Sequence, residues 1–259
     1  MESTIITKEN GIATIKLNRP DKYNSVTKEV AMSLQQFMDD CKKDAEVRCV
    51  VITGEGKAFS AGQDLQEYTA PDSPDIQQIV EKHYNPLITK IREIEKPVIA
   101  AVNGLAAGAG ANLALACDIV IAKESVYFLQ AFSKIGLVPD SGGTFFLPRL
   151  VGLARATALT FLGDKVSAKD AVAMGMIYKA VPDDEFETEV GKVASKLASM
   201  PTKGLGLTKQ ALNKSVICND FTIQLGIEEH FQDVAAQSED HKEGVAAFLE
   251  KRKPTFTGN

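Results

Sequence analysis

An uncharged, mostly apolar run from Val98 to Cys117, VIAAVNGLAAGAGANLALAC, constrains the fold of this chain more than any other segment. Its 20 residues are long enough to cross a bilayer, and Gly104 and Gly108 have the small-residue spacing of packed membrane helices. Two asparagines, three glycines and many alanines make the run only weakly apolar, so a membrane span is rejected. We predict instead a buried strand, a glycine turn and a buried helix, which need a core that covers them.

Composition and charge are those of an ordinary globular protein. The chain has 259 residues, 44% of them hydrophobic and 24% charged, enough for one large domain or two modest ones. Because 29 Lys and Arg oppose 34 Asp and Glu, the net charge is −5, and we expect neither a nucleic-acid partner nor a membrane. The four cysteines form no CxxC pair and the start MESTIITKEN has no signal-peptide pattern, so we expect a reduced, cytoplasmic chain.

Hydrophobic patterns alternate between strands and helices along most of the chain. Strands are predicted at 4–8, 12–18, 49–53, 98–102 and 119–122. Helices are predicted to begin at residues 27, 111, 154 and 167, and one more is predicted to end at about residue 93. Glycine-rich loops are predicted at 54–65, 104–110 and 136–143. From Glu185 onward the chain is nearly all helix, broken at Met200-Pro201 and Asn219-Asp220. An α/β body followed by about 70 helical residues predicts a core with a packing or oligomerisation arm.

Several common chemistries lack the residues they need. The three histidines, His83, His230 and His241, show no paired spacing and no HExxH motif, so we expect no metal site. There is no GxSxG nucleophile elbow and no phosphate-binding P-loop. The glycines of 104–110 do not form a dinucleotide fingerprint. They serve tight packing, or they let backbone N–H groups at a helix N-terminus approach a negatively charged ligand.

Four motifs occur together in the chain: AFSAGQDL at 58–65, KPVIAAVNG at 96–104, the pair Cys117-Asp118, and PDSGGT at 139–144. In this order and spacing the chain resembles the crotonase family, the enoyl-CoA hydratases and isomerases, over essentially its whole length. The resemblance implies an α/β fold, a spiral of ββα units in two sheets. Residues 1–195 would form this core, and 196–259 a C-terminal helical region for trimerisation that forms part of the CoA site. The resemblance further implies a homotrimer or homohexamer.

The same resemblance implies how the substrate is held. Members of the family stabilise the enolate of a CoA thioester with two backbone N–H donors, and the matching positions are Gln63 and Ala109. Both follow a glycine, so their N–H groups can come close to a thioester oxygen, and the helix N-terminus adds positive potential at Ala109. CoA enters as part of the substrate, and no separate cofactor is expected.

The positions that would handle protons depart from those of the hydratases. Hydratases of the family carry two glutamates, and the matching positions are Asn112 and Phe132, which cannot activate water as carboxylates. A carboxylate stands instead at Asp140, where the resemblance to Δ3,Δ2-enoyl-CoA isomerases and to the isomerase of ring-1,2-epoxyphenylacetyl-CoA implies an acid and base. Apolar neighbours, among them Phe145 and Phe146, are expected to raise its pKa. The alternative is that Asp140 caps the following helix.

Further substrate contacts are implied by the resemblance. Lys22 is the cation expected near the CoA phosphates. The run 251–253, Lys-Arg-Lys, adds charge across a subunit boundary or is a solvated helix end. The remaining residues expected to bind substrate are Ala61, Gly62, Asp64, Leu65, Gly108, Phe132 and Leu137. Residues 68–84 are expected to form a lid that shapes the acyl pocket.

The main hypothesis is an isomerase of an unsaturated or phenylacetate-derived acyl-CoA, in which Asp140 shuttles one proton. One alternative is a hydratase with an unexpected water site. Another is a hydrolase or dehalogenase in which Asp140 attacks an aryl carbon. A third is a non-catalytic or RNA-binding crotonase homologue, and the net charge of −5 without a dense basic stripe counts against RNA binding.

Overall fold

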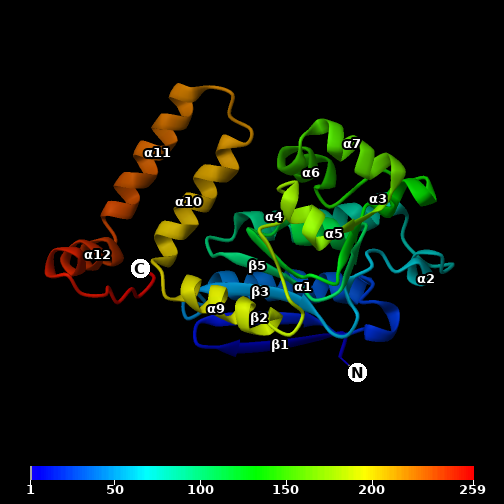
Figure 1. The fold of residues 1–259 in the computed structure, drawn as a ribbon, viewed down its shortest axis with the longest axis horizontal. Coiled ribbons are helices and arrows are strands. Elements are labelled where there is room, and N and C mark those ends of the chain that lie inside the picture. The colour runs from blue at the N-terminus through cyan, green and yellow to red at the C-terminus, as the bar shows by residue number, and fades with distance from the viewer. Residues whose placement is uncertain (1) are drawn as a thin grey trace.

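A six-stranded sheet forms the centre of the computed structural model, which describes residues 2–259 (Figure 1). Its spatial order is β1-β2-β3-β5-β7-β10, with β1 antiparallel to β2 and the other neighbours parallel. The strands are β1 (Thr4–Glu9), β2 (Ile12–Leu17), β3 (Cys49–Gly54), β5 (Val98–Val102), β7 (Ile119–Lys123) and β10 (Lys179–Val181). Parallel neighbours require crossover connections, which helices supply.

A second sheet has four strands in the order β4-β6-β8-β9. They are β4 (Ala58–Ser60), β6 (Leu105–Ala107), β8 (Tyr127–Leu129) and β9 (Lys165–Ser167). The successive pairs β3-β4, β5-β6 and β7-β8 each send one strand to each sheet before the chain continues into helix. This repeated path is the predicted spiral of ββα units. Because β4, β6 and β8 are parallel, their carboxyl ends meet at one edge of the second sheet.

Helices occupy the connections and the C-terminal region. The longer ones are α1 (Lys28–Lys43), α4 (Asn85–Glu93), α5 (Ala109–Ala116), α6 (Gly143–Val151), α7 (Leu153–Leu162), α9 (Phe186–Ala198), α10 (Thr202–Ser215), α11 (Phe221–Ala236) and α12 (Glu239–Glu250). The shorter ones are α2 (Leu65–Tyr68), α3 (Ile76–Ile79), α8 (Ala168–Ala173), the 3₁₀ turns η1 (Pro20–Lys22) and η3 (Ala131–Ile135), and the π-helical turn η2 (Val80–Tyr84).

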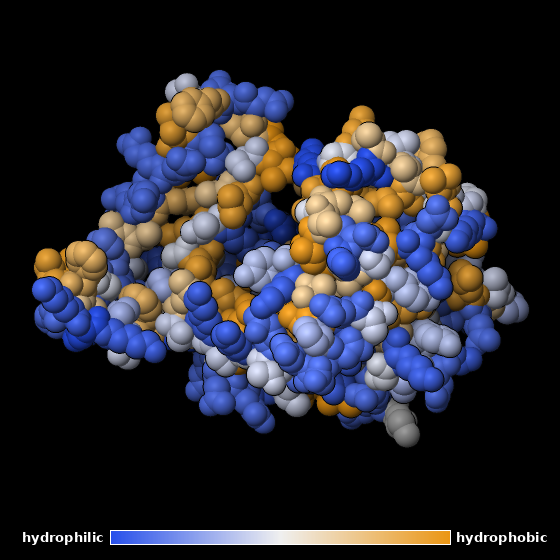
Figure 2. Space-filling model, viewed as in Figure 1, coloured by the Kyte–Doolittle hydropathy of each residue, from blue (hydrophilic) through white to orange (hydrophobic). Residues whose placement is uncertain are grey.

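The last three helices extend away from the two sheets, on the left of Figure 1, whereas α2 and α3 lie on the right. Figure 2 shows hydrophobic side chains on the surface of this arm. The large hydrophobic residues exposed there include Leu212, Ile217, Phe221, Ile223, Phe248 and Leu249. The breaks before α10 and α11 fall where the sequence predicts them.

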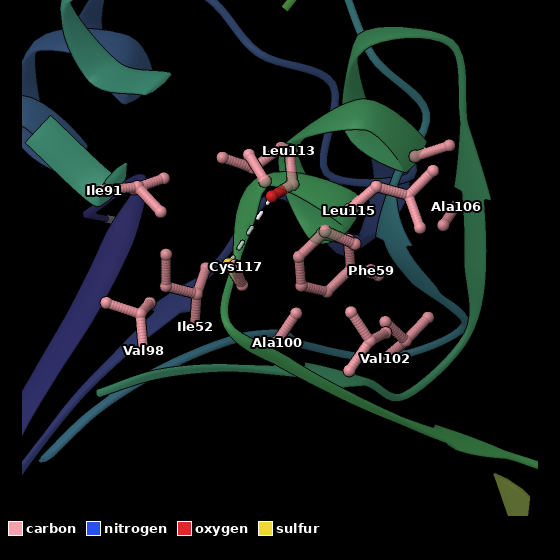
Figure 3. Packing of buried hydrophobic residues seen from close by; sticks show 14 of the residues in the cluster. Ile52, Phe59, Ile91, Val98, Ala100, Val102, Ala106, Leu113, Leu115 and Cys117 are labelled. Carbon is pink, nitrogen blue, oxygen red and sulfur yellow. Dashed lines mark hydrogen bonds between the residues drawn. The ribbon is translucent and has the colours of Figure 1, made fainter. Parts of the chain in front are cut away.

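Side chains of the central strands alternate between two hydrophobic layers. Val50 and Ile52 of β3 pack into the layer that contains residues of α1, α4 and α5, whereas Val51 packs into the layer formed with α9. The fully buried Phe59 of β4 lies close to Ala100 of β5 in the first layer, as Figure 3 shows. With both faces covered, the run 98–117 holds the predicted buried strand and buried helix, but a short strand, β6, lies where the sequence predicts only a glycine turn.

Two segments predicted as glycine loops each contain a short strand, β4 within 54–65 and β6 within 104–110. Gly104 permits this pairing because a Cβ there would lie 2.2 Å from the backbone oxygen of Lys57. Gly104 therefore serves close packing between the two backbones, which is the first of the two roles predicted for the glycines of 104–110. The sequence did not predict these strands, because glycine-rich segments have a low strand propensity. They are strands because they pair with each other in the folded chain.

The four cysteines are free thiols, and Cys41, Cys49 and Cys117 are buried. Burial raises the pKa of Cys117 to about 12, so this thiol serves as a small hydrophobic side chain. Within residues 2–259, no helix has both the length and the apolar character that a membrane span requires.

Candidate active site

A cavity of about 390 Å³ opens where the chain leaves the carboxyl ends of β4, β6 and β8. The structure brings together nine of the predicted site residues in its wall: Ala61, Gly62, Gln63, Leu65, Gly108, Ala109, Phe132, Leu137 and Asp140. Three further wall residues, Tyr68, Thr69 and Ile76, belong to the segment 68–84 that is expected to shape the acyl pocket. The sequence did not single out the remaining three, Ala131, Lys134 and Ile135. Residues from three distant segments thus share one pocket because three successive parallel strands end side by side.

The backbone N–H of Gln63 is a free donor on this wall. Val26 binds the residues on either side: its N–H donates to the Gly62 oxygen at 2.7 Å, and its oxygen accepts from the Asp64 N–H at 3.0 Å. Successive N–H groups of an extended segment point in opposite directions, so the N–H of Gln63 faces away from Val26. Among residues 2–259, no group accepts a hydrogen bond from it.

Ala109 provides a second free N–H. It is the first residue of α5, and the Gly108 before it turns the chain with φ of +53° and offers no side-chain cap. This turn starts the helix two residues earlier than the sequence predicts. The first N–H groups of a helix have no acceptor in the helix itself, and the helix dipole favours negative charge there. In the part of the chain that the structure describes, the Ala109 N–H has no other acceptor.

Gly62 lets the two donors come together. Its φ is +84°, and a Cβ on it would lie 3.1 Å from the Ala109 nitrogen and 2.9 Å from the Ala107 oxygen. The Gln63 segment can therefore lie directly against the start of α5 only with glycine at this position. Gln63 and Ala109 therefore bring to one cavity the two free backbone donors that an oxyanion hole requires.

Asp140 places a half-buried carboxylate on the same cavity. Burial raises the pKa of Asp140 to about 6, and a hydrogen bond from the Ser141 hydroxyl, at 3.0 Å, opposes that rise. The helix-cap alternative is wrong, because α6 begins at Gly143 with Gly142 as its cap residue and receives no side-chain cap. A carboxyl group with this pKa can both accept and return a proton near neutral pH.

Asn112 and Phe132 are the two residues that the resemblance to the hydratases sets against catalytic glutamates. Asn112 is fully buried, and both ends of its amide are engaged: Nδ2 donates to the backbone oxygen of Asp140 at 2.9 Å, and Oδ1 accepts from Nε2 of Gln130 at 2.8 Å. Phe132 is buried and lines the cavity near Gly108. Neither side chain offers a group that could take a proton from water.

Phe145 and Phe146, which the sequence predicts as apolar neighbours of Asp140, do not line the cavity that Asp140 lines. Both line a different, larger cavity of about 810 Å³, whereas Asp140 lines the smaller one. There the Arg149 guanidinium lies 3.8 Å from the centre of the Phe145 ring, and that of Arg92 lies 5.3 Å from the centre of the Phe146 ring. The Phe146 ring nevertheless packs against the loop that precedes α6, because a Cβ on Gly142 would lie 2.5 Å from a carbon of that ring.

The Asp64 side chain lies outside the cavity, although the sequence predicts it as a substrate-binding residue. It is buried, and its carboxylate accepts hydrogen bonds from Arg19, from Ser25 and from the first N–H groups of α2. Burial by itself raises the pKa of Asp64, but these donors together hold it below its usual value. Asp64 therefore shapes the backbone next to Gln63.

The predicted CoA cations lie outside the cavity wall. Lys22 is exposed and donates to the Gln66 side chain at 2.9 Å, which keeps it near the segment after Asp64. In the C-terminal run, Arg252 pairs with Glu243 and Glu250. Within residues 2–259, no residue after Asp140 lines the cavity, so the C-terminal run also lies outside it.

Sequence reasoning missed the role of Tyr84. The predicted single helix up to residue 93 is broken into α3, a π-helical turn and α4, and the turn places Tyr84 inside the protein. Its hydroxyl donates to Oε1 of Gln63 at 2.8 Å. His83 is also buried and lies outside the cavity wall. Both positions fall in the predicted lid segment 68–84, but the sequence carries no signal for their burial, because a π-helical turn shifts the helical register.

Comparison with known proteins agrees with this geometry. The family model described as Enoyl-CoA hydratase/isomerase matches residues 7–259. The 1,2-epoxyphenylacetyl-CoA isomerase of Escherichia coli (strain K12) is 47% identical over 100% of this chain and 99% of its own length. A probable enoyl-CoA hydratase of Rhodobacter capsulatus is 43% identical over 96% of this chain and 95% of its own.

Solved structures give the same result. An enoyl-CoA hydratase structure from Bacillus anthracis has a TM-score of 0.94 and 32% identity, covering 99% of this chain and all of that one. The two-sheet spiral, the paired N–H donors and the full-length matches lead to one conclusion. The chain is an enzyme of the enoyl-CoA hydratase/isomerase family, the crotonase family.

Proposed function

We propose that this enzyme is an acyl-CoA isomerase that shifts a double bond, or isomerises a ring epoxide, in an unsaturated or phenylacetate-derived CoA thioester. The observation that carries the proposal is a single carboxylate, Asp140, on the cavity that also holds the free N–H groups of Gln63 and Ala109. A double-bond shift needs one group that takes a proton from one carbon and returns it to another.

In the proposed reaction the thioester oxygen lies between the N–H groups of Gln63 and Ala109. Asp140 removes a proton from the carbon next to the thioester carbonyl, and the electron pair moves onto the oxygen, where each donor contributes about 3 kcal/mol. The same carboxyl group then protonates the far carbon of the original double bond. Atoms and electrons balance within the substrate, so the reaction needs no cofactor besides the CoA that the substrate carries.

Water addition has weaker support. Asn112 has no free amide atom, and Phe132 is apolar, so the cavity offers Asp140 as its acid or base. General acids and bases each contribute about 10²–10⁴-fold to a rate, so loss of two carboxylates disfavours hydration. The relative with 47% identity is named an isomerase. The relative with 43% identity is named a probable hydratase, so hydration remains the alternative.

The proposal includes assembly into a homotrimer or homohexamer. The hydrophobic side chains exposed on α10 to α12 support association, because a monomer rarely leaves so many uncovered. Another subunit would also be the source of any C-terminal contact with CoA.

The first test is conversion of a 3-enoyl-CoA to its 2-enoyl isomer, followed by absorbance and by mass spectrometry. We expect isomerisation without gain of water, and a loss of about 10³-fold or more in Asp140→Asn. Asp184→Asn is the matched control, because it removes an exposed carboxylate outside the cavity, and it should retain full activity.

Two further results would redirect the assignment. Gain of one water in the product, unaffected by Asp140→Asn, would establish a hydratase. If a turnover in ¹⁸O-labelled water left label in the Asp140 side chain, the carboxylate would be a nucleophile, as the dehalogenase alternative requires.

A further inference from the structure

The amide of Asn112 joins three segments around Asp140. It lies in α5, binds the backbone oxygen of Asp140 through Nδ2 at 2.9 Å, and accepts a hydrogen bond from Gln130, just after β8, at 2.8 Å. Asn112 and Gln130 are both buried, so water does not compete for these bonds.

The direction of both bonds is fixed. The Asp140 backbone oxygen can only accept, so the amide nitrogen of Asn112 must face it and the amide oxygen must face Gln130. Gln130 therefore donates through Nε2, and its own Oε1 is buried without a partner.

The segment that follows Asp140 is strained. Ser141 has a φ of +51° and Gly142 one of +77°, so two successive residues adopt a conformation that residues with side chains rarely take. Gly143 then packs so closely that a Cβ on it would lie 2.2 Å from Nδ2 of Asn112. A strained turn persists only where surrounding contacts hold it, and the Asn112 amide is such a contact.

The Asp140 carboxylate makes few hydrogen bonds that could hold it in place. Its one hydrogen bond within residues 2–259 comes from the adjacent Ser141 hydroxyl, whereas its backbone oxygen accepts bonds from both Asn112 and Gly143. The place where the carboxylate enters the cavity is thus set through the backbone.

We propose that Asn112 is a positioning residue for Asp140: its amide, oriented by Gln130, holds the strained turn that presents the carboxylate to the cavity. This inference rests on the proposed function for its effect on turnover. In this proposal Asn112 positions Asp140, whereas the resemblance to the hydratases sets a proton-transferring glutamate at the same place in the sequence.

The test is Asn112→Leu, which keeps the approximate size and removes the donor. We expect kcat to fall about 10²-fold with KM changed by no more than about threefold, because a displacement near 1 Å is enough for such a loss. The pKa of Asp140 should fall from about 6 toward its usual value, because the released turn lets water reach the carboxyl group. Infrared titration of protein carrying ¹³C-aspartate measures that pKa, with Asp140→Asn identifying the signal.

Two further variants serve as controls for this test. Gln130→Leu removes only the group that orients Asn112, and it should shift kcat and the Asp140 pKa in the same direction by less. It also keeps the inference testable if Asn112→Leu does not fold. Leu115→Ala, a buried residue of the same helix without a bond to the turn, is the control for general destabilisation and should leave the Asp140 pKa unchanged.

An unchanged Asp140 pKa in the folded Asn112 and Gln130 variants, or a loss of kcat no larger than that of Leu115→Ala, would overturn the proposal. If the unaltered protein does not isomerise 3-enoyl-CoA, the proposed function fails, and the pKa measurement alone decides the positioning role. A fall in that pKa would then still support Asn112 as the residue that holds Asp140.

Discussion

Arg19 donates a hydrogen bond from Nη1 to Oδ2 of Asp64 at 2.8 Å, across 45 residues of sequence. The carboxylate is almost completely buried, and its other oxygen accepts the first N–H groups of α2. This ion pair fixes the residue directly after Gln63, so it holds one wall of the candidate site in place without touching the cavity.

Asp64→Asn should lower the free energy of unfolding by about 2–4 kcal/mol at pH 7, because it leaves the Arg19 charge unpaired and weakens the cap of α2. The pKa of Asp64 is held below its usual value, so its stabilisation is complete above pH 4 and is lost as the pH falls further. The difference from the unaltered protein should therefore shrink in acid. Urea unfolding at pH 7 and pH 3.5 measures it, with exposed Asp21→Asn as a control that stays within about 0.5 kcal/mol.

Asp140→Asn should make the protein more stable at neutral pH. The folded-state pKa of Asp140, about 6, lies above its usual value of 3.8, so the charged form disfavours folding and stability declines as the pH rises from 4 to 6. Asparagine removes this penalty, and we expect a gain of roughly 1–3 kcal/mol at pH 7.5 that vanishes near pH 4. A variant that is less stable at pH 7.5, in urea unfolding, would contradict the burial that raises this pKa.

Gly62→Ala should remove most activity. The new Cβ would lie 2.9 Å from the Ala107 oxygen and 3.1 Å from the Ala109 nitrogen, so the two N–H donors are pushed apart. Loss of one oxyanion donor typically lowers kcat about 10²–10³-fold. Gly152→Ala is the matched control, since its φ of +80° is similar but no atom lies within 4 Å of the added Cβ. Equal losses of kcat in both variants would show that backbone strain, not crowding, is the cause.

Tyr84→Phe should reduce kcat about tenfold and leave KM little changed, because Oε1 of Gln63 loses its donor and the backbone N–H beside it is held less firmly. Burial, followed by the negative charge of Asp140, raises the pKa of Tyr84, so its hydroxyl stays protonated and donates. Steady-state kinetics with a 3-enoyl-CoA measures the change. Exposed Tyr178→Phe is the control, and an equal effect there would argue against this role.

Much of the fold could be predicted from local patterns. The alternating strands, the amphipathic helix that became α1, the buried run 98–117 and the breaks before α10 and α11 depend on residues close in sequence, because hydrophobic periodicity and glycine or proline breaks act locally. The resemblance to the family implied a departure from two glutamates at Asn112 and Phe132, and residue identity at 140 supplied a carboxylate.

Other features depend on contacts between distant segments, and these only the tertiary structure decided. Strands β4 and β6 form in glycine-rich sequence because they pair with each other, and the Gln63 N–H is free because Val26 takes up its neighbours. The pKa of Asp140 rises through burial by residues far away in the chain, and Tyr84 reaches Gln63 through a π-helical turn. The sequence by itself determined which groups are present, whereas the direction of each hydrogen bond and the access of water to each group arise only when the strands and helices pack.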